Sequence, residues 1–582
     1  MPRLILVRRE KNAETPRKGR FHLIMLFRSL GVIAFTSSFL VPNHYPPWTS
    51  FHSELAAFVG LISLCCAVLS DGKQILFDRA LLITVCLTGV VFVQWVFGQI
   101  AYSGDALVGN LYLSGFVLAW WLGTNLSFIE RRISDVSVIL VVSAIASVFI
   151  AMLQWLRMEA ALGIFAADLG PGMRPFGNLG QPNHLSTLAL MGIGATSALF
   201  FKNQLKKWQF TLLVAFLSFG LILTQSRTGL VSAFVLGVFF LFYGCRLWSP
   251  GSWKFIAAWW ILLVVFVSLW APLNETLYLQ PAREQLTAED KPRVIMWKQM
   301  IAALEQSPWI GYGWRQTVVA QKIGADVVEG ILPTDYAHNF FLDVLVWLGI
   351  PMGGSLILWI CYWLLQAAKK IKNRTEFFLL ATVVPVGIHS LLEFPFTYAY
   401  FLFPVGWLLG TLNAHQNINL FQKQRNFTRS AKLGMTVFIL VFASLCSWVA
   451  VEYLKVESDY QIMRFEMRRV GVIPASYHAP QLTLLTQFSE VLIVGRIVPS
   501  IGMPPEDLAR MGVASSNLAW ATLQLNYAVA LGLNGRQEEA SLQLQNLRNI
   551  YGAKSYEQAL ALFNDLKNTK YPQLVLVKLK EN

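Results

Sequence analysis

The sequence has 582 residues, of which 55% are apolar and 14% charged, and its mean hydropathy is +0.50. These values exclude a soluble globular protein of this size and predict an all-α, polytopic membrane protein. The net charge of +14 would suit nucleic-acid binding, but many of the basic residues lie in short loops between apolar segments. The six cysteines form no CxxC pair and no metal-ligand spacing, so we expect free thiols.

Roughly 13 apolar runs approach the ~20 residues that an α-helix needs to cross a bilayer. They cover residues 22–41, 51–70, 76–98, 106–127, 135–156, 183–201, 208–225, 228–245, 254–272, 338–366, 376–392, 396–413 and 433–452. The basic residues 1–21 precede the first run without an evident small-residue cleavage site. We therefore expect a retained signal anchor with a cytoplasmic N-terminus.

The distribution of Lys and Arg predicts the orientation. The short loops on the expected cytoplasmic side hold 24 of these residues, whereas the opposite short connections 42–50, 99–105 and 393–395 hold none. By the positive-inside rule, an odd number of spans places the tail outside. The predicted domains are a cytoplasmic N-terminus (1–21), a transmembrane domain (22–452) with a large outward loop (273–337), and an outward helical domain (453–582).

Two outward loops carry polar side chains beside the membrane. The loop 157–182 ends in GPGMRPFGNLGQPNH, whose Pro and Gly residues prevent regular helix and leave polar groups at the mouth of the next span. These groups are Arg174, Asn178, Gln181, Asn183 and His184. The loop 273–337 predicts a helix over about 292–306, ended by Pro308 and lying along the membrane surface.

The tail 453–582 contains NLAWATLQLNYAVALGLNGRQEEASLQLQNLRNIY and then SYEQALALFNDLKN. Apolar residues at helical spacing, interrupted by LGLNG, indicate helix hairpins of the tetratricopeptide kind, although fewer than three repeats are visible. The tail could serve only as a packing cap, or it could bind a partner.

The stretch 334–351, TDYAHNFFLDVLVWLGIP, places a polar cluster at the lip of a membrane-length apolar run. The cluster consists of Asp335, Tyr336, His338 and Asn339. The positive end of a helix macrodipole disfavours protonation of His338, which keeps its imidazole available as a base or acceptor. A polar helix cap is the structural alternative.

Arg227, in TQSRTG between two spans, lies at or just above hydrocarbon depth. An arginine at the centre of a membrane helix costs roughly 2.5–3.5 kcal/mol, so Arg227 needs a carboxylate or a bound anion as partner. Glu393 could supply a purely structural ion pair. Alternatively, Arg174, Arg293 and Arg315 could gather with Arg227 at the outward face of the membrane. Such a group would bind an anionic lipid headgroup, since guanidinium groups match phosphate oxygens.

The sequence lacks a Walker loop, a GxGxxG, an HExxH and an acidic cluster on an outward loop. We therefore expect chemistry without a nucleotide or a metal. Because the outward face has no supply of nucleotide sugars or ATP, an activated donor would have to be assembled inside and carried in the membrane. A lipid-diphosphate sugar fits that requirement.

Five segments in order, GNLGQPNH (177–184), SRTG (226–229), PWIGYGW (308–314), the His338 stretch and HSLLEFPFTY (389–398), resemble the bacterial protein O-oligosaccharyltransferases. These form the pilin-glycosylating branch of the O-antigen ligase and polymerase superfamily. The resemblance implies a metal-independent glycosyltransferase in the bacterial inner membrane with its active site facing the periplasm. It would move a preassembled glycan from undecaprenyl diphosphate to a Ser or Thr hydroxyl of a periplasmic protein such as pilin.

The resemblance also implies roles for particular residues. His338 matches the essential loop histidine, while Arg227 and Arg293 match arginines that hold the donor diphosphate. Arg174, from the outward set of arginines, is a further candidate for binding the diphosphate. The branch motif supplies Gln181, Asn183 and His184 as substrate-binding residues. Glu393 and Tyr398 correspond to polar residues of the late outward turn, Glu393 as a second catalytic candidate. Tyr398 and, from the polar cluster beside His338, Tyr336 are further substrate-binding candidates. Asparagine-directed transferases need a WWD-type segment, and the nearest text, WWLG at 120–123, lacks the aspartate.

Direct attack of the hydroxyl on the anomeric carbon predicts inversion of configuration. Arg227 and Arg293 would stabilise the leaving diphosphate, and His338 would take the proton. Alternatively, His338 binds phosphate and Glu393 is the base. An O-antigen ligase with a lipid A core acceptor, or an O-antigen polymerase, is the competing function. A transporter should show internal inverted repeats and charged residues at the membrane midplane. The few charges within the apolar runs and the position of the motifs at the membrane lip argue against it.

Overall fold

The computed structural model describes residues 18–71, 75–126, 134–248, 251–279, 291–417, 429–468, 470 and 477–578. Within these ranges all regular structure is helical and no strand is present, which confirms the predicted all-α class. Short 3-10 turns (η1 Arg79–Leu81, η2 Glu159–Phe165, η4 Pro395–Thr397 and η5 Pro572–Leu576) join some of the helices.

Each predicted apolar run coincides with a helix. These helices are α1 Lys18–Ser37, α2 Phe51–Ser70, α3 Leu82–Val96, α4 Ser103–Leu126, α5 Ser134–Trp155, α6 Pro182–Phe201, α7 Lys207–Leu223, α8 Arg227–Leu247, α9 Trp253–Thr276, α12 Phe340–Lys369, α13 Arg374–Ser390, α14 Ala399–Gln416 and α16 Arg429–Met467. Among the described residues, ten are long and apolar enough to cross a membrane, whereas α7, α13 and α14 do not meet that length and composition. The chain is therefore a multi-pass membrane protein.

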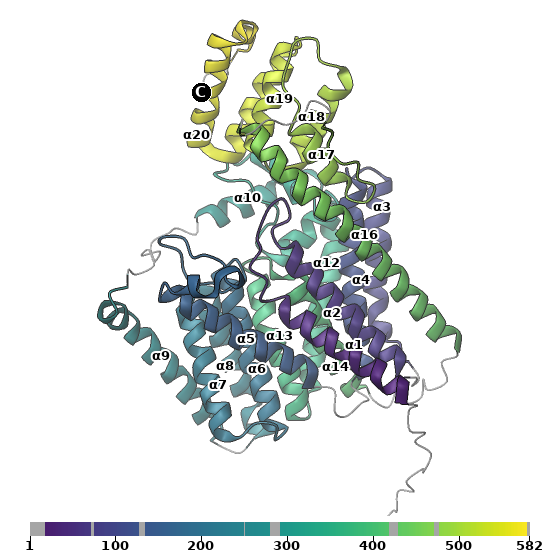
Figure 1. The fold of residues 1–582 in the computed structure, drawn as a ribbon, viewed down its shortest axis with the longest axis vertical. Coiled ribbons are helices and arrows are strands. Elements are labelled where there is room, and N and C mark those ends of the chain that lie inside the picture. Colours follow the sequence, from purple (N-terminus) through teal and green to yellow (C-terminus); the bar gives the residue numbers. More distant parts are fainter. Residues whose placement is uncertain are drawn as a thin grey trace, which may run out of the picture.

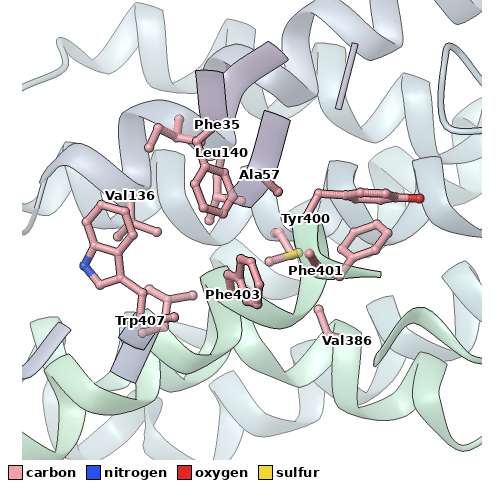
Figure 2. Close-up of a cluster of buried hydrophobic side chains, with 14 of the residues drawn as sticks. Phe35, Ala57, Val136, Leu140, Val386, Tyr400, Phe401, Phe403 and Trp407 are labelled. Carbon is pink, nitrogen blue, oxygen red and sulfur yellow. The ribbon is translucent and has the colours of Figure 1, made fainter. Parts of the chain in front are cut away.

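The centre of the bundle is built around α14. Figure 2 shows Phe401, Phe403 and Trp407 of α14 gathered with Phe35 of α1 and Leu140 of α5, and all five side chains are buried. Close helix contact accompanies this packing. A Cβ atom on the glycine at position 123 of α4 would lie 2.1 Å from the Trp407 carbonyl oxygen, so only glycine fits there.

The last membrane helix does not end where the tail was expected to begin. α16 continues past residue 452 to Met467 and runs as one helix from the bundle to the C-terminal helices (Figure 1). Those helices are α17 Thr486–Val494, α18 Pro505–Asn517, α19 Ala521–Leu533 and α20 Gln537–Thr569, and α20 is interrupted at Gly552. The predicted helical tail is confirmed, and the LGLNG segment separates α19 from α20 as expected.

The loop between α9 and α12 contains two helices. α10 (Lys291–Gln306) confirms the predicted helix, whereas α11 (Thr317–Ala325) was not predicted. α11 packs on α18 and α20. Lys322 of α11 donates a hydrogen bond to the Ser515 carbonyl oxygen, and the Gly330 amide donates to the Asn549 carbonyl oxygen at 2.6 Å. The loop is therefore attached to the C-terminal helices.

Candidate functional site

Glu393 is the centre of the candidate site. It lies in the turn between α13 and η4, and its side chain is only 3% exposed. Its Oε2 lies 2.5 Å from His338 Nδ1, and its Oε1 accepts a hydrogen bond from Arg293 Nη2 of α10. Asn183 Nδ2 lies 3.4 Å from the same Oε1. The fold thus brings together side chains from four separate segments.

The surroundings of Glu393 determine its charge. Burial alone would raise the pKa of this carboxyl, but the hydrogen bond and charge of His338 and the charge of Arg293 outweigh burial and lower the pKa to about 2. Glu393 is therefore a carboxylate near neutral pH. The side chains of His338 and Arg293 are 23% and 32% exposed, so the open side of the site presents these two groups rather than the acid.

His338 has a positive φ of 52°, a conformation that costs about 1–3 kcal/mol in a non-glycine residue. The chain on both sides holds it there. The Ala337 amide donates to Asp343 Oδ1 at 2.8 Å, and Asn339 caps α12 by accepting from the Phe341 and Leu342 amides at 3.0 and 3.2 Å. The predicted position of His338 just before a helix N-terminus is confirmed.

Two further bonds attach this loop to its neighbours. Trp297 Nε1 of α10 donates to the Ala337 carbonyl oxygen at 2.8 Å, and Asn339 Nδ2 donates to the Leu391 carbonyl oxygen at 3.2 Å. Leu391 lies two residues before Glu393. The loop that carries His338 is therefore fixed both to the helix that carries Arg293 and to the turn that carries Glu393.

The QPNH and SRTG segments meet at Asn183. Asn183 Oδ1 accepts from Ser226 Oγ at 2.7 Å, and Ser226 Oγ accepts from the Gly229 amide at 2.9 Å, which caps α8. Arg227 is the first residue of that helix. Asn183 therefore links the start of α8 to Glu393.

Arg174 is bonded to the same connection, since its Nη1 donates to the Gln225 carbonyl oxygen at 3.0 Å. Burial lowers the pKa of Arg174, Glu393 raises it, and the positive charge of Arg227 lowers it again. Arg174 is therefore attached to the connection that leads into α8, whose first residue is Arg227. The grouping of these arginines around a diphosphate stays a prediction.

Two other predicted residues, Gln181 and His184, lie at the start of α6. Gln181 is the N-cap residue of α6, and its carbonyl oxygen accepts from the His184 amide at 3.1 Å. His184 is buried, its Nδ1 lies 3.3 Å from the Leu179 carbonyl oxygen, and its ring meets that of Tyr398 edge-on at 4.7 Å. The His184 ring therefore packs against the Tyr398 ring.

Phe394 contacts three of the predicted site residues, although it was not itself predicted. Its ring stacks on Tyr336 at 5.0 Å and on Tyr398 at 6.1 Å, and it meets His338 edge-on at 4.7 Å. Phe394 lies within the HSLLEFPFTY segment, next to Glu393. That adjacency was the available sequence signal, but an apolar residue in an apolar segment does not stand out.

The bundle contains an apolar cavity of about 460 Å³ among α3, α4, α12, α13 and α14. Leu87, Trp120 and Val386 are among its lining residues, and so are Tyr336 and Leu391 of the two site loops. The cavity thus reaches the site. No group of three or more His, Cys, Asp or Glu side chains that could hold a metal ion occurs in the part of the chain that the structure describes.

Comparisons with known proteins identify the family of the chain. Family models match residues 212–358 ("O-Antigen ligase"), 175–200 ("Protein glycosylation ligase") and 377–562 ("Virulence factor membrane-bound polymerase, C-terminal"). The sequence is 29% identical over 561 residues to the general O-oligosaccharyltransferase of Acinetobacter baylyi, covering 91% of this chain and 93% of the relative.

It is also 30% identical over 447 residues to the ComP-specific O-oligosaccharyltransferase of the same organism, covering 74% of this chain and 78% of that relative. Both relatives therefore align with most of the membrane bundle. The chain belongs to the O-oligosaccharyltransferases of the O-antigen ligase superfamily, and it is a membrane glycosyltransferase that joins a glycan to a protein acceptor.

Proposed function

We propose that this glycosyltransferase takes its glycan from undecaprenyl diphosphate and places it on a Ser or Thr hydroxyl of a periplasmic protein such as pilin, without a metal ion. The observation that carries the proposal is the proximity of the apolar cavity to His338, Glu393 and Arg293. An apolar cavity suits a polyprenyl chain, and guanidinium groups suit a diphosphate.

The charge asymmetry of the loops supports a position in the inner membrane with the site facing the periplasm. In this orientation the transmembrane domain 22–452 is the catalytic domain, and the loop 273–337 and the domain 453–582 are periplasmic. The lipid-linked donor and the secreted acceptor would then meet on the same side of the membrane.

His338 is the proposed general base, and Glu393 is its positioning residue. If His338 Nδ1–H donates to Glu393 Oε2, the other ring nitrogen, Nε2, carries the lone pair that can accept the hydroxyl proton. Both carboxylate oxygens of Glu393 are already hydrogen-bonded, Oε2 to His338 and Oε1 to Arg293, which favours this assignment over Glu393 as the base. Binding of phosphate by His338 is the alternative role.

The arginines are proposed to stabilise the leaving diphosphate. Arg293 is partly exposed, and Arg227 begins α8, next to the connection to which Arg174 is bonded. Their charges would oppose the negative charge that develops on the diphosphate oxygen as its bond to the sugar breaks. Tyr336 and Tyr398, on either side of Phe394, are proposed to contact the substrate. Asn183, Gln181 and His184 are proposed to shape the substrate-binding surface from α6.

In the proposed step, a bond forms between the acceptor oxygen and the anomeric carbon while the bond from that carbon to the diphosphate oxygen breaks. The acceptor proton moves to His338 Nε2. A single displacement inverts the anomeric configuration. The anomeric linkage of the isolated glycopeptide, measured by NMR against that of the donor, tests this step, and a product with retained configuration would contradict it.

Reconstitution tests the donor. Purified wild-type protein in liposomes, supplied with undecaprenyl diphosphate glycan and a purified acceptor, should yield glycosylated acceptor, and His338→Ala should not. The same preparation is also supplied with native membranes that contain the natural donor. Transfer from native membranes but not from the defined lipid would refute undecaprenyl diphosphate as donor.

The match of residues 212–358 to the O-antigen ligase model makes a glycolipid acceptor the second candidate. Intact-protein mass spectrometry and lipopolysaccharide analysis of a deletion strain distinguish the two. Loss of glycan mass from a pilin or another periplasmic protein is expected. Unchanged protein masses together with altered lipopolysaccharide would favour the glycolipid acceptor.

A further inference from the structure

Arg315 belongs to the predicted outward set of arginines, but the proposed transfer step gives it no role. It has a positive φ of 61°, a conformation that is strained in a non-glycine residue and is found most often at functional sites. The apolar cavity in the bundle has Arg315 among its lining residues, together with Tyr336 and Leu391 of the two site loops. The guanidinium carbon of Arg315 lies 6.0 Å from the centroid of the Tyr336 ring. Arg315 is therefore part of the wall of the cavity that reaches the site.

The first turns of α4 place a carboxylate near Arg315. Asp105 and Gly109 lie one helical turn apart and share a face of α4. Trp314, the neighbour of Arg315, packs on this face, because a Cβ atom on Gly109 would lie 2.9 Å from Trp314 Cδ1. Burial lowers the pKa of Arg315, but its neighbours Tyr336 and Asp105 raise it above the ordinary value. The charge of Asp105 therefore acts on Arg315.

The charged groups around Arg315 are not bonded to one another. Within the described ranges Arg315 forms no ion pair, and the carboxylates of Asp105 and Asp335 accept no hydrogen bond. Asp335 is exposed and directly precedes Tyr336. A guanidinium has several N–H donors, and a carboxylate offers only acceptors. Donors and acceptors are therefore available near one another for a ligand.

A sugar is the ligand that suits this set of groups. Each sugar hydroxyl both donates and accepts hydrogen bonds, so a guanidinium and a carboxylate can bind it together. The flat faces of the Tyr336 and Phe394 rings suit the C–H groups of a sugar ring. A diphosphate suits the set less well, because the carboxylates of Asp105 and Asp335 outnumber the guanidinium and would repel a further anion.

The position of Arg315 also fits a sugar. The transferred sugar is bonded to the lipid carrier and has to lie between that carrier and the acceptor hydroxyl. The Tyr336 ring stacks on Phe394 at 5.0 Å, and Phe394 meets His338 edge-on at 4.7 Å. Arg315 thus lies on the other side of these two rings from His338, in the wall of the cavity that suits the lipid chain.

We propose that Arg315, with Asp105 and Asp335, binds hydroxyl groups of the donor glycan and so determines which glycan is transferred. The diphosphate is left to Arg293 and Arg227. The proposal rests on the transfer site at His338 of the proposed function, but it does not depend on which lipid carries the glycan.

A comparison of two glycans tests the proposal. Native membranes are prepared from two strains that attach different glycans to the same lipid, one of them the glycan of the enzyme's own strain. Each serves as donor for full-length enzyme and one purified acceptor, and kcat/KM is measured for both. We expect wild type to prefer its own glycan, and Arg315→Gln, Asp105→Asn and Asp335→Asn each to reduce this preference by about tenfold, because a hydrogen bond to a charged group is lost.

Arg464→Gln is the matched control. Arg464 also lies over a tyrosine ring, 5.6 Å from the centroid of Tyr45, but it does not line the cavity. Its preference should equal that of wild type. Thermal unfolding in detergent checks each variant, and Asp335→Asn, at an exposed position, supplies the measurement if Arg315→Gln does not fold.

Three results would overturn the proposal. One is a wild type that transfers both glycans equally well. Another is an equal loss of transfer from both glycans in the Arg315 and aspartate variants, which would assign these residues to the carrier or to folding. The third is the same loss of preference in Arg464→Gln. Because native membranes supply both donors, failure of the undecaprenyl diphosphate assignment leaves the ratio intact.

Inhibition by the carrier alone separates a sugar from a diphosphate as the ligand of Arg315. Undecaprenyl diphosphate without a glycan is added to the transfer reaction. We expect its half-inhibitory concentration for Arg315→Gln to lie within about twofold of wild type. Weaker inhibition of Arg315→Gln would assign Arg315 to the diphosphate and contradict the proposal. A wild type that is not inhibited would count against the carrier assignment, and the ratio of the two glycans would still decide the proposal.

Discussion

His338 Nδ1 and Glu393 Oε2 lie 2.5 Å apart, although one residue precedes α12 and the other follows α13. A second bond joins the same two segments, because Asn339 Nδ2 donates to the Leu391 carbonyl oxygen. The buried acid thus fixes the imidazole, while the side chains of His338 and Arg293 remain 23% and 32% exposed. Four predictions test this arrangement.

The first concerns the role of His338. We expect His338→Gln to lower kcat by about 10²- to 10⁴-fold, because an amide cannot take up the hydroxyl proton. Donor affinity, measured in parallel with labelled donor, should change by less than about threefold. A large loss of donor affinity with a near-normal rate at saturating donor would instead assign His338 to phosphate binding.

The second concerns the charge of Glu393. Its pKa of about 2 lies below the ordinary value of 4.5, so the folded protein holds the carboxylate charged while the unfolded chain takes up a proton. The resulting stabilisation is complete above about pH 4.5 and is lost as the pH falls towards 2, by at most about 1.4 kcal/mol per pH unit. The stability difference between wild type and Glu393→Gln should therefore shrink over this window.

Denaturant unfolding in detergent at several pH values measures that difference. Glu557→Gln, at an exposed position of α20, serves as the control, and its difference from wild type should stay small at each pH. If the Glu393→Gln difference does not vary between pH 2 and 4.5, the ionised Glu393 does not stabilise the fold in the manner described.

The third concerns Arg293. Arg293→Met should lower kcat/KM for the donor by about 10- to 100-fold, because it removes a partly exposed positive charge that would stabilise the leaving diphosphate. Arg293→Lys should lie between wild type and Arg293→Met, since it restores the charge but not the planar pair of donors. Equal effects of Lys and Met would show that geometry rather than charge is required.

The fourth separates two functions of Asn339. Asn339→Ala should lower the free energy of unfolding by about 1 kcal/mol, because the cap of α12 is lost. Asn339→Ser should retain the cap but lose the bond to Leu391, so its stability should be near wild type while kcat still falls severalfold. Thermal unfolding and transfer rates measured on both variants decide whether that bond positions His338, and full activity of Asn339→Ser would argue against it.

The membrane helices could be predicted from sequence because their signal is local. Runs of about twenty apolar residues suffice to indicate α2 or α6, and the Pro and Gly residues after α10 indicate where it ends. α11 gave no comparable signal. It is short, and it packs on α18 and α20, which follow it in the chain by about two hundred residues or more, so its stability comes from tertiary packing rather than propensity.

In the candidate site, too, some features follow from a local sequence pattern and others depend on residues far apart in the chain. The position of His338 beside a helix N-terminus follows from a local pattern. The ion pair of Glu393 with Arg293 joins residues 100 positions apart, and the sequence analysis had considered Arg227 as the structural partner of Glu393 instead. Which arginine meets the acid depends on how α10 lies over the bundle, and no periodicity encodes that. The extension of α16 to Met467 was missed because its outer part has a polar composition.

The attachment of α11 to the C-terminal helices bears on attempts to recombine this enzyme with its relatives. A chimera joined where the composition changes, near residue 452, would cut α16 in mid-helix and pair a foreign domain with the native 317–330 segment. It would then lose the contacts of Lys322 with Ser515 and of Gly330 with Asn549. The exchangeable unit is discontinuous in sequence, and a graft that preserves folding has to carry both pieces together.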